Sequence, residues 1–272
     1  MFLHLLIIFF HSALYPSFGL PTLTEVYKAH DGHVSLKWDN FLYVYEAELL
    51  QYRRRTNLRL LEVGVMNGGG LEIWQKYFDP TSEIIGIDID SNVCEFLQLD
   101  DVKLYCFDAT SSYGTIQGDF DVIIDDASHS SPDVINTFLL WFKRLSKGGV
   151  YIVEDLEHSY KWDSGGGLHR PGSSMKFFQA LTDLLNFYSL RSEDQEVFNE
   201  NYVHLYGKDN ILYLVDWVSS VKFIDQMVIV QKKAMKRHEL HLIATGRKAP
   251  IAPYFGPLNP TQAANFERTK DL

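Results

Sequence analysis

Short apolar runs alternate with segments of helical spacing over residues 59–153, and this alternation constrains the fold more than any other feature of the chain. We predict strands at five of these runs, namely RLLEV, IIGID, VKLYC, FDVII and GVYIV. Helical spacing separates them over residues 71–77, 92–97 and 132–145. Strands and helices that alternate in this way form βαβ units around a parallel sheet.

The segments on either side of this core extend the prediction. Residues 36–52 have the spacing of an amphipathic helix, and a further helix is expected at residues 175–187. The sequence VKFIDQMVIVQK predicts two strands joined by a tight turn at Asp225 and Gln226. Such an antiparallel hairpin would complete the sheet.

The length of 272 residues suits one α/β domain with additions. We place an N-terminal helical segment at residues 20–57, the α/β domain at 58–245 and a C-terminal tail at 246–272. A glycine-rich loop within 160–174 follows the last parallel strand, next to the strand ends where a ligand would bind. It is either a lid over that site or a plain linker into the next helix.

The first nineteen residues are typical of a secretory signal peptide. An apolar stretch at residues 2–10 precedes Pro16 and small residues, with cleavage expected after Gly19. The stretch is shorter than the roughly 20 apolar residues of a membrane span. This predicts a lumenal or secreted protein with no membrane span, and the alternative is a retained segment on a cytosolic protein. Cys94 and Cys106 are expected to be two buried thiols, although an oxidising lumen would allow one bridge between them.

The formal charge of −10 argues against a nucleic-acid partner. Phosphate binding needs clustered Lys and Arg, and the densest basic cluster here is the triplet at residues 53–55. A solvated helix end explains that triplet. A homo-oligomer remains compatible with the sequence.

A glycine-rich turn follows the first predicted strand. Glu62 lies near the end of this strand, and glycines occupy positions 64, 68, 69 and 70. The spacing differs from the G-x-G-x-x-G of dinucleotide sites, because three residues separate Gly64 from Gly68. The turn therefore favours a cofactor without a pyrophosphate, and S-adenosylmethionine fits. Asp88 ends the second strand, where it could accept both ribose hydroxyls, and Asp108 follows the third, where it could accept from an adenine amino group.

Four carboxylates follow the last two strands of the core. Asp125, Asp126, Glu154 and Asp155 meet at one edge if the strands are parallel neighbours. Their mutual repulsion is unfavourable without a cation, and Mg²⁺ prefers such oxygen ligands. The metal-free interpretation leaves one acid of each pair as an exposed helix cap. His129 can point into the same cavity, and its ordinary pKa near 6.5 suits proton transfer.

The blocks LLEVGVMNGGGLEIWQKYF, IIGIDID, FDVIIDDASHSS, GGVYIVEDLEHSY and VKFIDQMVIVQK resemble the class I methyltransferases, in particular the metal-dependent sugar O-methyltransferases. The resemblance covers about residues 36–232 and implies a Rossmann-like seven-stranded fold, mostly parallel, with an antiparallel C-terminal hairpin. Gly70 departs from it, since the family usually has a Ser after its glycine pair that would touch the cofactor's carboxylate.

The resemblance also implies the roles of the site residues. It assigns a divalent metal, Mg²⁺ or another hard cation, to Asp126, Glu154 and Asp155, and the general base to His129. Asp125 would face the methionine end of the cofactor or support the turn. The full set of expected cofactor-binding residues is Glu62, Gly64, Asn67, Gly68, Asp88, Asp108 and Asp125.

The expected reaction is methyl transfer to a metal-bound hydroxyl of a sugar or glycosylated substrate. Two alternatives stay open. One is a catechol-type O-methyltransferase, although residues 160–174 and about thirty residues after Tyr188 could wall a larger acceptor site. The other is a non-catalytic module that binds the cofactor and recognises a glycan or a protein.

Overall fold

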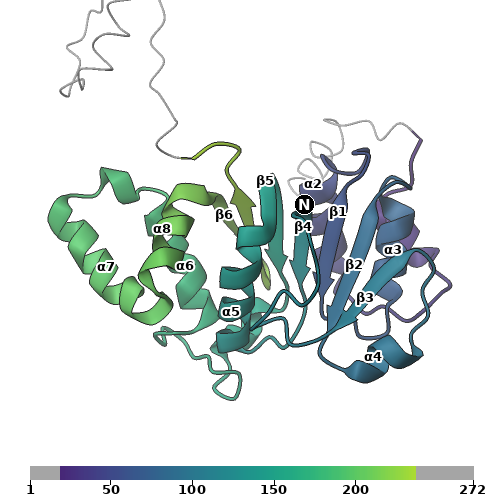
Figure 1. Ribbon diagram of the computed structural model, residues 1–272, viewed down its shortest axis with the longest axis horizontal. Helices are drawn as coiled ribbons and strands as arrows, with labels where there is room; N and C mark the ends of the chain where they lie inside the picture. The colour runs from purple at the N-terminus through teal and green to yellow at the C-terminus, as the bar shows by residue number, and fades with distance from the viewer. Residues whose placement is uncertain (1–18, 237–272) are drawn as a thin grey trace, which may run out of the picture.

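A seven-stranded sheet passes through the middle of the molecule in the computed structural model, which describes residues 19–236 (Figure 1). The strand order is β3-β2-β1-β4-β5-β7-β6. The strands are β1 (Arg59–Val63), β2 (Glu83–Asp88), β3 (Val102–Cys106), β4 (Phe120–Asp125), β5 (Leu145–Val153), β6 (Val218–Ile224) and β7 (Met227–Lys232). Strands β1 to β5 are parallel, whereas β7 pairs antiparallel with both β5 and β6. The mostly parallel sheet with an antiparallel hairpin, predicted from the sequence, is confirmed.

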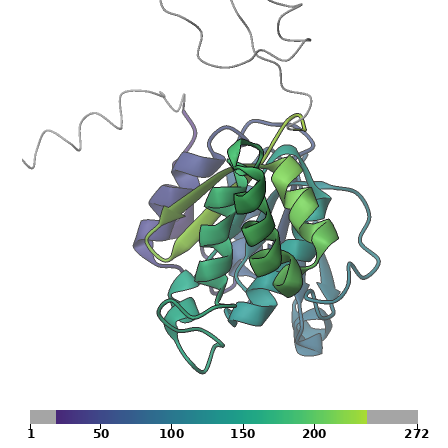
Figure 2. The same ribbon diagram turned by 90° about the vertical axis from the view of Figure 1, so that its left-hand side faces the viewer.

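Helices cover both faces of the sheet, because alternate strand residues are apolar on each side. The helices are α1 (Leu23–Lys28), α2 (Asp39–Leu49), α3 (Gly69–Tyr77), α4 (Ser91–Phe96), α5 (Ser131–Trp141), α6 (Ser174–Leu184), α7 (Ser192–Tyr206) and α8 (Lys208–Trp217). Three short 3₁₀ turns lie at Phe142–Arg144, Leu156–Tyr160 and Phe187–Ser189. One apolar core joins the sheet to α1, α2 and α3, and the other joins it to α5, α6 and α8. Figure 2 shows the green helices of this second layer facing the viewer.

Three predicted helices differ from those observed. The helix expected at 175–187 ends at Leu184. The expected helix at 36–52 begins only at Asp39, since Trp38 has an extended backbone and acts as the N-cap. The helix expected at 132–145 ends at Trp141, and after a 3₁₀ turn Leu145 already starts β5. Strand β5 therefore begins at a residue that the helical spacing assigns to the preceding helix.

The cysteines differ from expectation as well. Cys94 of α4 and Cys106 of β3 form a disulfide, with their Cα atoms 6.0 Å apart, so the prediction of two free thiols is wrong. Helix α4 packs along β3 and brings the two side chains together. Spacing alone could not show this proximity.

The predicted signal peptide lies almost wholly outside the described residues, and the predicted C-terminal tail at 246–272 lies wholly outside them. Within residues 19–236, no helix is both long and apolar enough to cross a membrane.

Candidate functional site

A cavity of about 620 Å³ opens at the carboxyl ends of the parallel strands. Seven of the site residues predicted from the sequence line it, namely Gly64, Asp88, Asp108, Asp125, Asp126, His129 and Asp155. This is the edge where α/β sheets bind ligands, since the loops after β1 and β4 diverge there. This cavity therefore lies at the edge of the sheet where the sequence places the site.

The turn after β1 forms one wall of this cavity. Gly64 has a φ of +87° and Gly68 a φ of +82°, a left-handed backbone that glycine adopts at little cost. The Asp88 carboxylate supports the turn by accepting hydrogen bonds from the backbone N–H groups of Val65 and Met66 at 3.0 and 3.1 Å. Asp88 thus connects the end of β2 to the turn after β1.

The predicted cofactor-binding residues divide into two groups. Gly64, Asp88, Asp108 and Asp125 line the cavity, whereas Glu62, Asn67 and Gly68 are outside its lining. Glu62 is buried and Asn67 is exposed. Binding of the cofactor by these residues stays a prediction.

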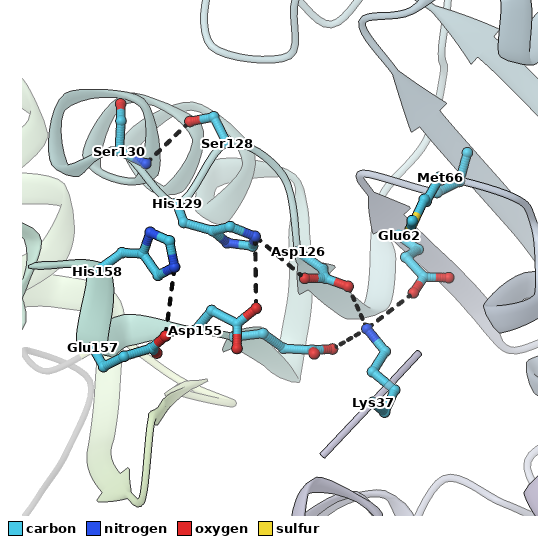
Figure 3. Close-up of polar contacts among 12 residues, drawn as sticks. Lys37, Glu62, Met66, Asp126, Ser128, His129, Ser130, Asp155, Glu157 and His158 are labelled. Carbon is cyan, nitrogen blue, oxygen red and sulfur yellow. Dashed lines mark hydrogen bonds and ion pairs between the residues drawn. The ribbon is translucent and has the colours of Figure 1, made fainter. Parts of the chain in front are cut away.

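Three side chains from neighbouring loops come together at the floor of the site. Asp126, His129 and Asp155 each offer a ligand atom, and these atoms all lie within 4.8 Å of one another. His129 Nε2 is 3.6 Å from Asp155 Oδ2 and 3.9 Å from Asp126 Oδ1 (Figure 3). Asp155 Oδ1 is buried and has no hydrogen-bond partner among the described residues. Two carboxylates, an imidazole and an unsatisfied oxygen fit a hard divalent cation.

Three non-glycine residues that line the cavity have a left-handed backbone. His129 and Asp155 have φ values of +55° and +50°, and Met66 in the cavity wall has +49°. A left-handed conformation costs a non-glycine residue about 1–2 kcal/mol. Packing must hold these residues in place, and such strain is often concentrated at functional sites.

Glu154 does not join these three residues. Its side chain, 2% exposed, accepts a short hydrogen bond from the Tyr45 hydroxyl and another from Lys37 Nζ at 2.6 Å. Burial raises the pKa of Glu154 to about 7, although the Lys37 ammonium opposes this rise. Both hydrogen bonds are to Oε1 of Glu154, and the metal-ligand role expected for this residue stays a prediction.

Lys37 is the residue of this site that sequence analysis missed. Its Nζ donates to Asp126 Oδ2 and Glu154 Oε1, and it lies 3.8 Å from Glu62 Oε1. Burial raises the pKa of Glu62 to about 8 despite the nearby ammonium. Burial alone would lower the pKa of Lys37, but the surrounding carboxylates, Glu154 above all, raise it, so the ammonium stays charged. No local pattern around residue 37 indicates such a contact.

Asp125 has a separate environment, on the cavity side of β4. It is 2% exposed, and its Oδ2 accepts a hydrogen bond from the Tyr151 hydroxyl at 3.2 Å. Burial raises the pKa of Asp125 to about 7, against the effect of that hydrogen bond. This carboxyl therefore binds a proton more readily than an ordinary aspartate does.

The glycine-rich loop is anchored beside His129. The Ser131 backbone N–H, at the start of α5, donates to the Ser164 carbonyl at 2.8 Å. Trp162 in this loop is 83% exposed, so an aromatic face lies open near the site. The lid role of residues 160–174 stays a prediction. The described cavity lining contains no residue of 188–218, because α8 and the buried Phe198 of α7 pack into the core beside α6.

The sheet order, the glycine turn after β1 and the acid at the end of β2 define the fold of the class I methyltransferases, as the sequence predicted. The solved structure of MycE methyltransferase in complex with Mg, SAH and Mycinamycin VI has this fold, with a TM-score of 0.63 and 22% identity. The match covers 84% of this chain and 58% of that chain.

The relatives of this chain in sequence include several curated O-methyltransferases. The mycinamicin VI 2''-O-methyltransferase of Micromonospora griseorubida is 28% identical over 187 residues, which is 62% of this chain and 46% of the relative. The 8-demethyl-8-alpha-L-rhamnosyl tetracenomycin-C 2'-O-methyltransferase of Streptomyces olivaceus is 32% identical over 168 residues, or 57% and 44%. The matches thus span less than half the length of these two curated relatives. No model of a protein family matches the chain.

Proposed function

We propose that this protein is an S-adenosylmethionine-dependent O-methyltransferase that uses a divalent metal and acts on a hydroxyl of a sugar or glycosylated substrate. One observation carries the proposal. The cavity that is lined by Asp88 and Asp108 is also lined by Asp126 and Asp155, whose carboxylates fit a hard cation, and by His129 beside them. The names of the sequence relatives supply the acceptor class.

Each part of the cavity has a proposed task. Asp88 would bind the ribose hydroxyls and Asp108 the adenine amino group, while Gly64 leaves room for the methionine end. Asp126 and Asp155 would hold the metal. When bound, the cofactor supplies an electrophilic methyl group on a sulfonium, and the metal lowers the pKa of a bound hydroxyl. The protein's own part is to hold the acceptor oxygen in line with that methyl group.

His129 would remove the acceptor's proton. Its Nε2 lies within 4 Å of a carboxylate oxygen of both Asp126 and Asp155, so it would lie close to a hydroxyl bound to a metal on these two residues. A proton taken there leaves an imidazolium between two carboxylates, which stabilise it. A base must keep its lone pair free, so this role excludes metal ligation through the same nitrogen.

The main test is an acceptor screen with methyl-labelled S-adenosylmethionine, with and without EDTA. Macrolide glycosides, rhamnosides and a catechol form the panel, and we expect metal-dependent transfer to the glycosides. Transfer to the catechol alone would favour the small-molecule alternative. Cofactor binding without any S-adenosylhomocysteine formation across the panel would contradict the proposed enzyme.

The role of His129 is tested separately with His129→Ala. We expect this variant to lose turnover but to keep the Mn²⁺ affinity of the wild type, measured by electron paramagnetic resonance. A large loss of Mn²⁺ affinity would assign His129 to the metal and remove it as the base.

We also infer that the protein acts in the secretory lumen. The apolar start of the chain supports this, and so does the Cys94–Cys106 disulfide, since structural disulfides are rare in the cytosol. N-terminal sequencing of the mature protein is expected to begin at Leu20. A mature chain that retains residues 2–10 would contradict this location.

A further inference from the structure

Lys37 reaches the acidic floor of the site from a segment outside the α/β core. It precedes α2, and its side chain is only 6% exposed. Figure 3 shows its ammonium between the carboxylates of Asp126 and Glu62, and a third carboxylate, that of Glu154, accepts a hydrogen bond from it at 2.6 Å. One cation therefore contacts three acidic side chains from three different strand ends.

The segment before Lys37 is fastened to the start of α3. The backbone N–H of His33 donates to Glu72 Oε2 at 2.7 Å, and His33 Nδ1 lies 3.1 Å from Glu72 Oε1. A Cβ atom at Gly69 would lie 2.2 Å from the His33 carbonyl oxygen, so the segment passes directly over that glycine. Contacts with Gly69 and Glu72 at the start of α3 thus fix the path of residues 33–37. This path directs the Lys37 side chain toward the acidic residues of the site.

Asp126 is shared between Lys37 and the candidate metal ligands. Its Oδ2 accepts from Lys37, while its Oδ1 faces His129 at 3.9 Å. Glu154 accepts from both Lys37 and Tyr45 through its Oε1. A divalent ion that binds Asp126 must therefore do so beside an ammonium, and the same ammonium occupies one oxygen of Glu154.

We propose that Lys37 is a tethered cation that competes with the divalent metal for Asp126 and Glu154 and thereby sets the metal affinity of the site. This inference rests on the proposed metal-dependent function. The ammonium compensates the buried carboxylates before metal binds, which a cluster of this charge requires. The same positive charge repels an incoming cation, so metal occupancy depends on the ambient metal concentration.

The test compares Mn²⁺ binding by the full chain, followed by electron paramagnetic resonance, in wild type, Lys37→Met and Lys37→Gln. We expect both variants to bind Mn²⁺ about ten-fold more tightly or better, because a unit charge close to a divalent ion is removed. Lys103→Met is the matched control. It makes the same change in net charge at a 60%-exposed lysine that pairs with Glu83, and we expect less than a two-fold effect.

Part of the expected gain in Mn²⁺ affinity should come from the release of Glu154 by the lysine. In a Glu154→Gln background, Lys37→Met should give a smaller gain in Mn²⁺ affinity, since no carboxylate is released at position 154. Folded Lys37 variants that bind Mn²⁺ as weakly as wild type, or more weakly, would overturn the proposal. So would an undiminished gain in the Glu154→Gln background.

A variant that does not fold without metal is tested by its thermal unfolding in a Mn²⁺ titration. We expect the midpoint to rise more with Mn²⁺ in the Lys37 variants than in wild type, and an equal rise would overturn the proposal. These measurements need no turnover. If the Mn²⁺ affinity depends on Lys37 but the protein methylates no acceptor, only the proposed function is contradicted. If the enzyme is active but the Lys37 variants bind Mn²⁺ as the wild type does, only this inference is contradicted.

Discussion

Gly64 is the position where one added methyl group should do most damage to the site. It follows β1, has a φ of +87° and lines the cavity. A Cβ atom there would lie 2.2 Å from the carbonyl oxygen of Asp126 and 2.7 Å from the Cα of Ala127. Both contacts are with backbone, and Asp126 is tied to β1 by its N–H, which donates to the Val63 carbonyl at 2.9 Å. The loop after β4 therefore cannot yield without losing a hydrogen bond.

The cost of Gly64→Ala is the sum of two effects. The left-handed backbone costs an alanine about 1–2 kcal/mol, and overpacking of a tight site costs about 1–3 kcal/mol. We expect the free energy of unfolding to fall by about 2–5 kcal/mol. Because Asp126 itself is displaced, the Mn²⁺ affinity should fall at least about ten-fold, as it does when the support of metal ligands is disturbed.

Gly148→Ala is the matched control. Gly148 has a φ of +77°, but a Cβ atom there would meet nothing within 4 Å. It therefore carries the conformational cost of about 1–2 kcal/mol without the clash. Urea denaturation followed by circular dichroism compares the two variants, and Mn²⁺ binding is measured on the folded proteins. Equal losses of stability in both, or wild-type Mn²⁺ affinity in Gly64→Ala, would refute the reasoning.

Three further predictions follow from the site and its surroundings. Asp155→Asn should weaken Mn²⁺ binding by about 100-fold while calorimetry shows unchanged S-adenosylmethionine affinity, and normal Mn²⁺ binding would rule out the candidate metal ligands. The double substitution of Cys94 and Cys106 by Ser should lower the free energy of unfolding by about 2–3 kcal/mol and abolish any effect of dithiothreitol, and a stability equal to wild type would contradict a structural role for the bridge. Burial raises the pKa of Asp125 from 3.8 to about 7, so the folded state binds the proton more tightly than the unfolded state and stability falls as the pH rises through that range. Asp125→Asn removes this titration, and urea midpoints from pH 4 to 8 should decline less steeply than in wild type; an unchanged slope would show that other groups cause it.

The strands of the parallel sheet could be predicted from sequence because each is encoded locally. Strand β1 spans Arg59–Val63, the residues of the predicted RLLEV, and the turn between β6 and β7 lies at the predicted Asp225 and Gln226. A strand buried on both faces leaves a nearly continuous apolar signal, which needs no knowledge of its neighbours. The acids after β4 and β5 could be brought to one edge by the rule that parallel strands end together.

Contacts between distant segments were decided only by the tertiary structure. Lys37 meets Glu154 across 117 positions of the chain, and no residue near either one signals the encounter. Likewise, the disulfide depends on how α4 lies along β3, and the tight approach of Gly64 to Asp126 depends on the register of β1 against β4. A sequence pattern indicates which face of each helix or strand is apolar and will be buried. The partner of a buried charge is set instead by the packing of several segments at once, so the acidic pairs were visible in the sequence but the lysine between them was not.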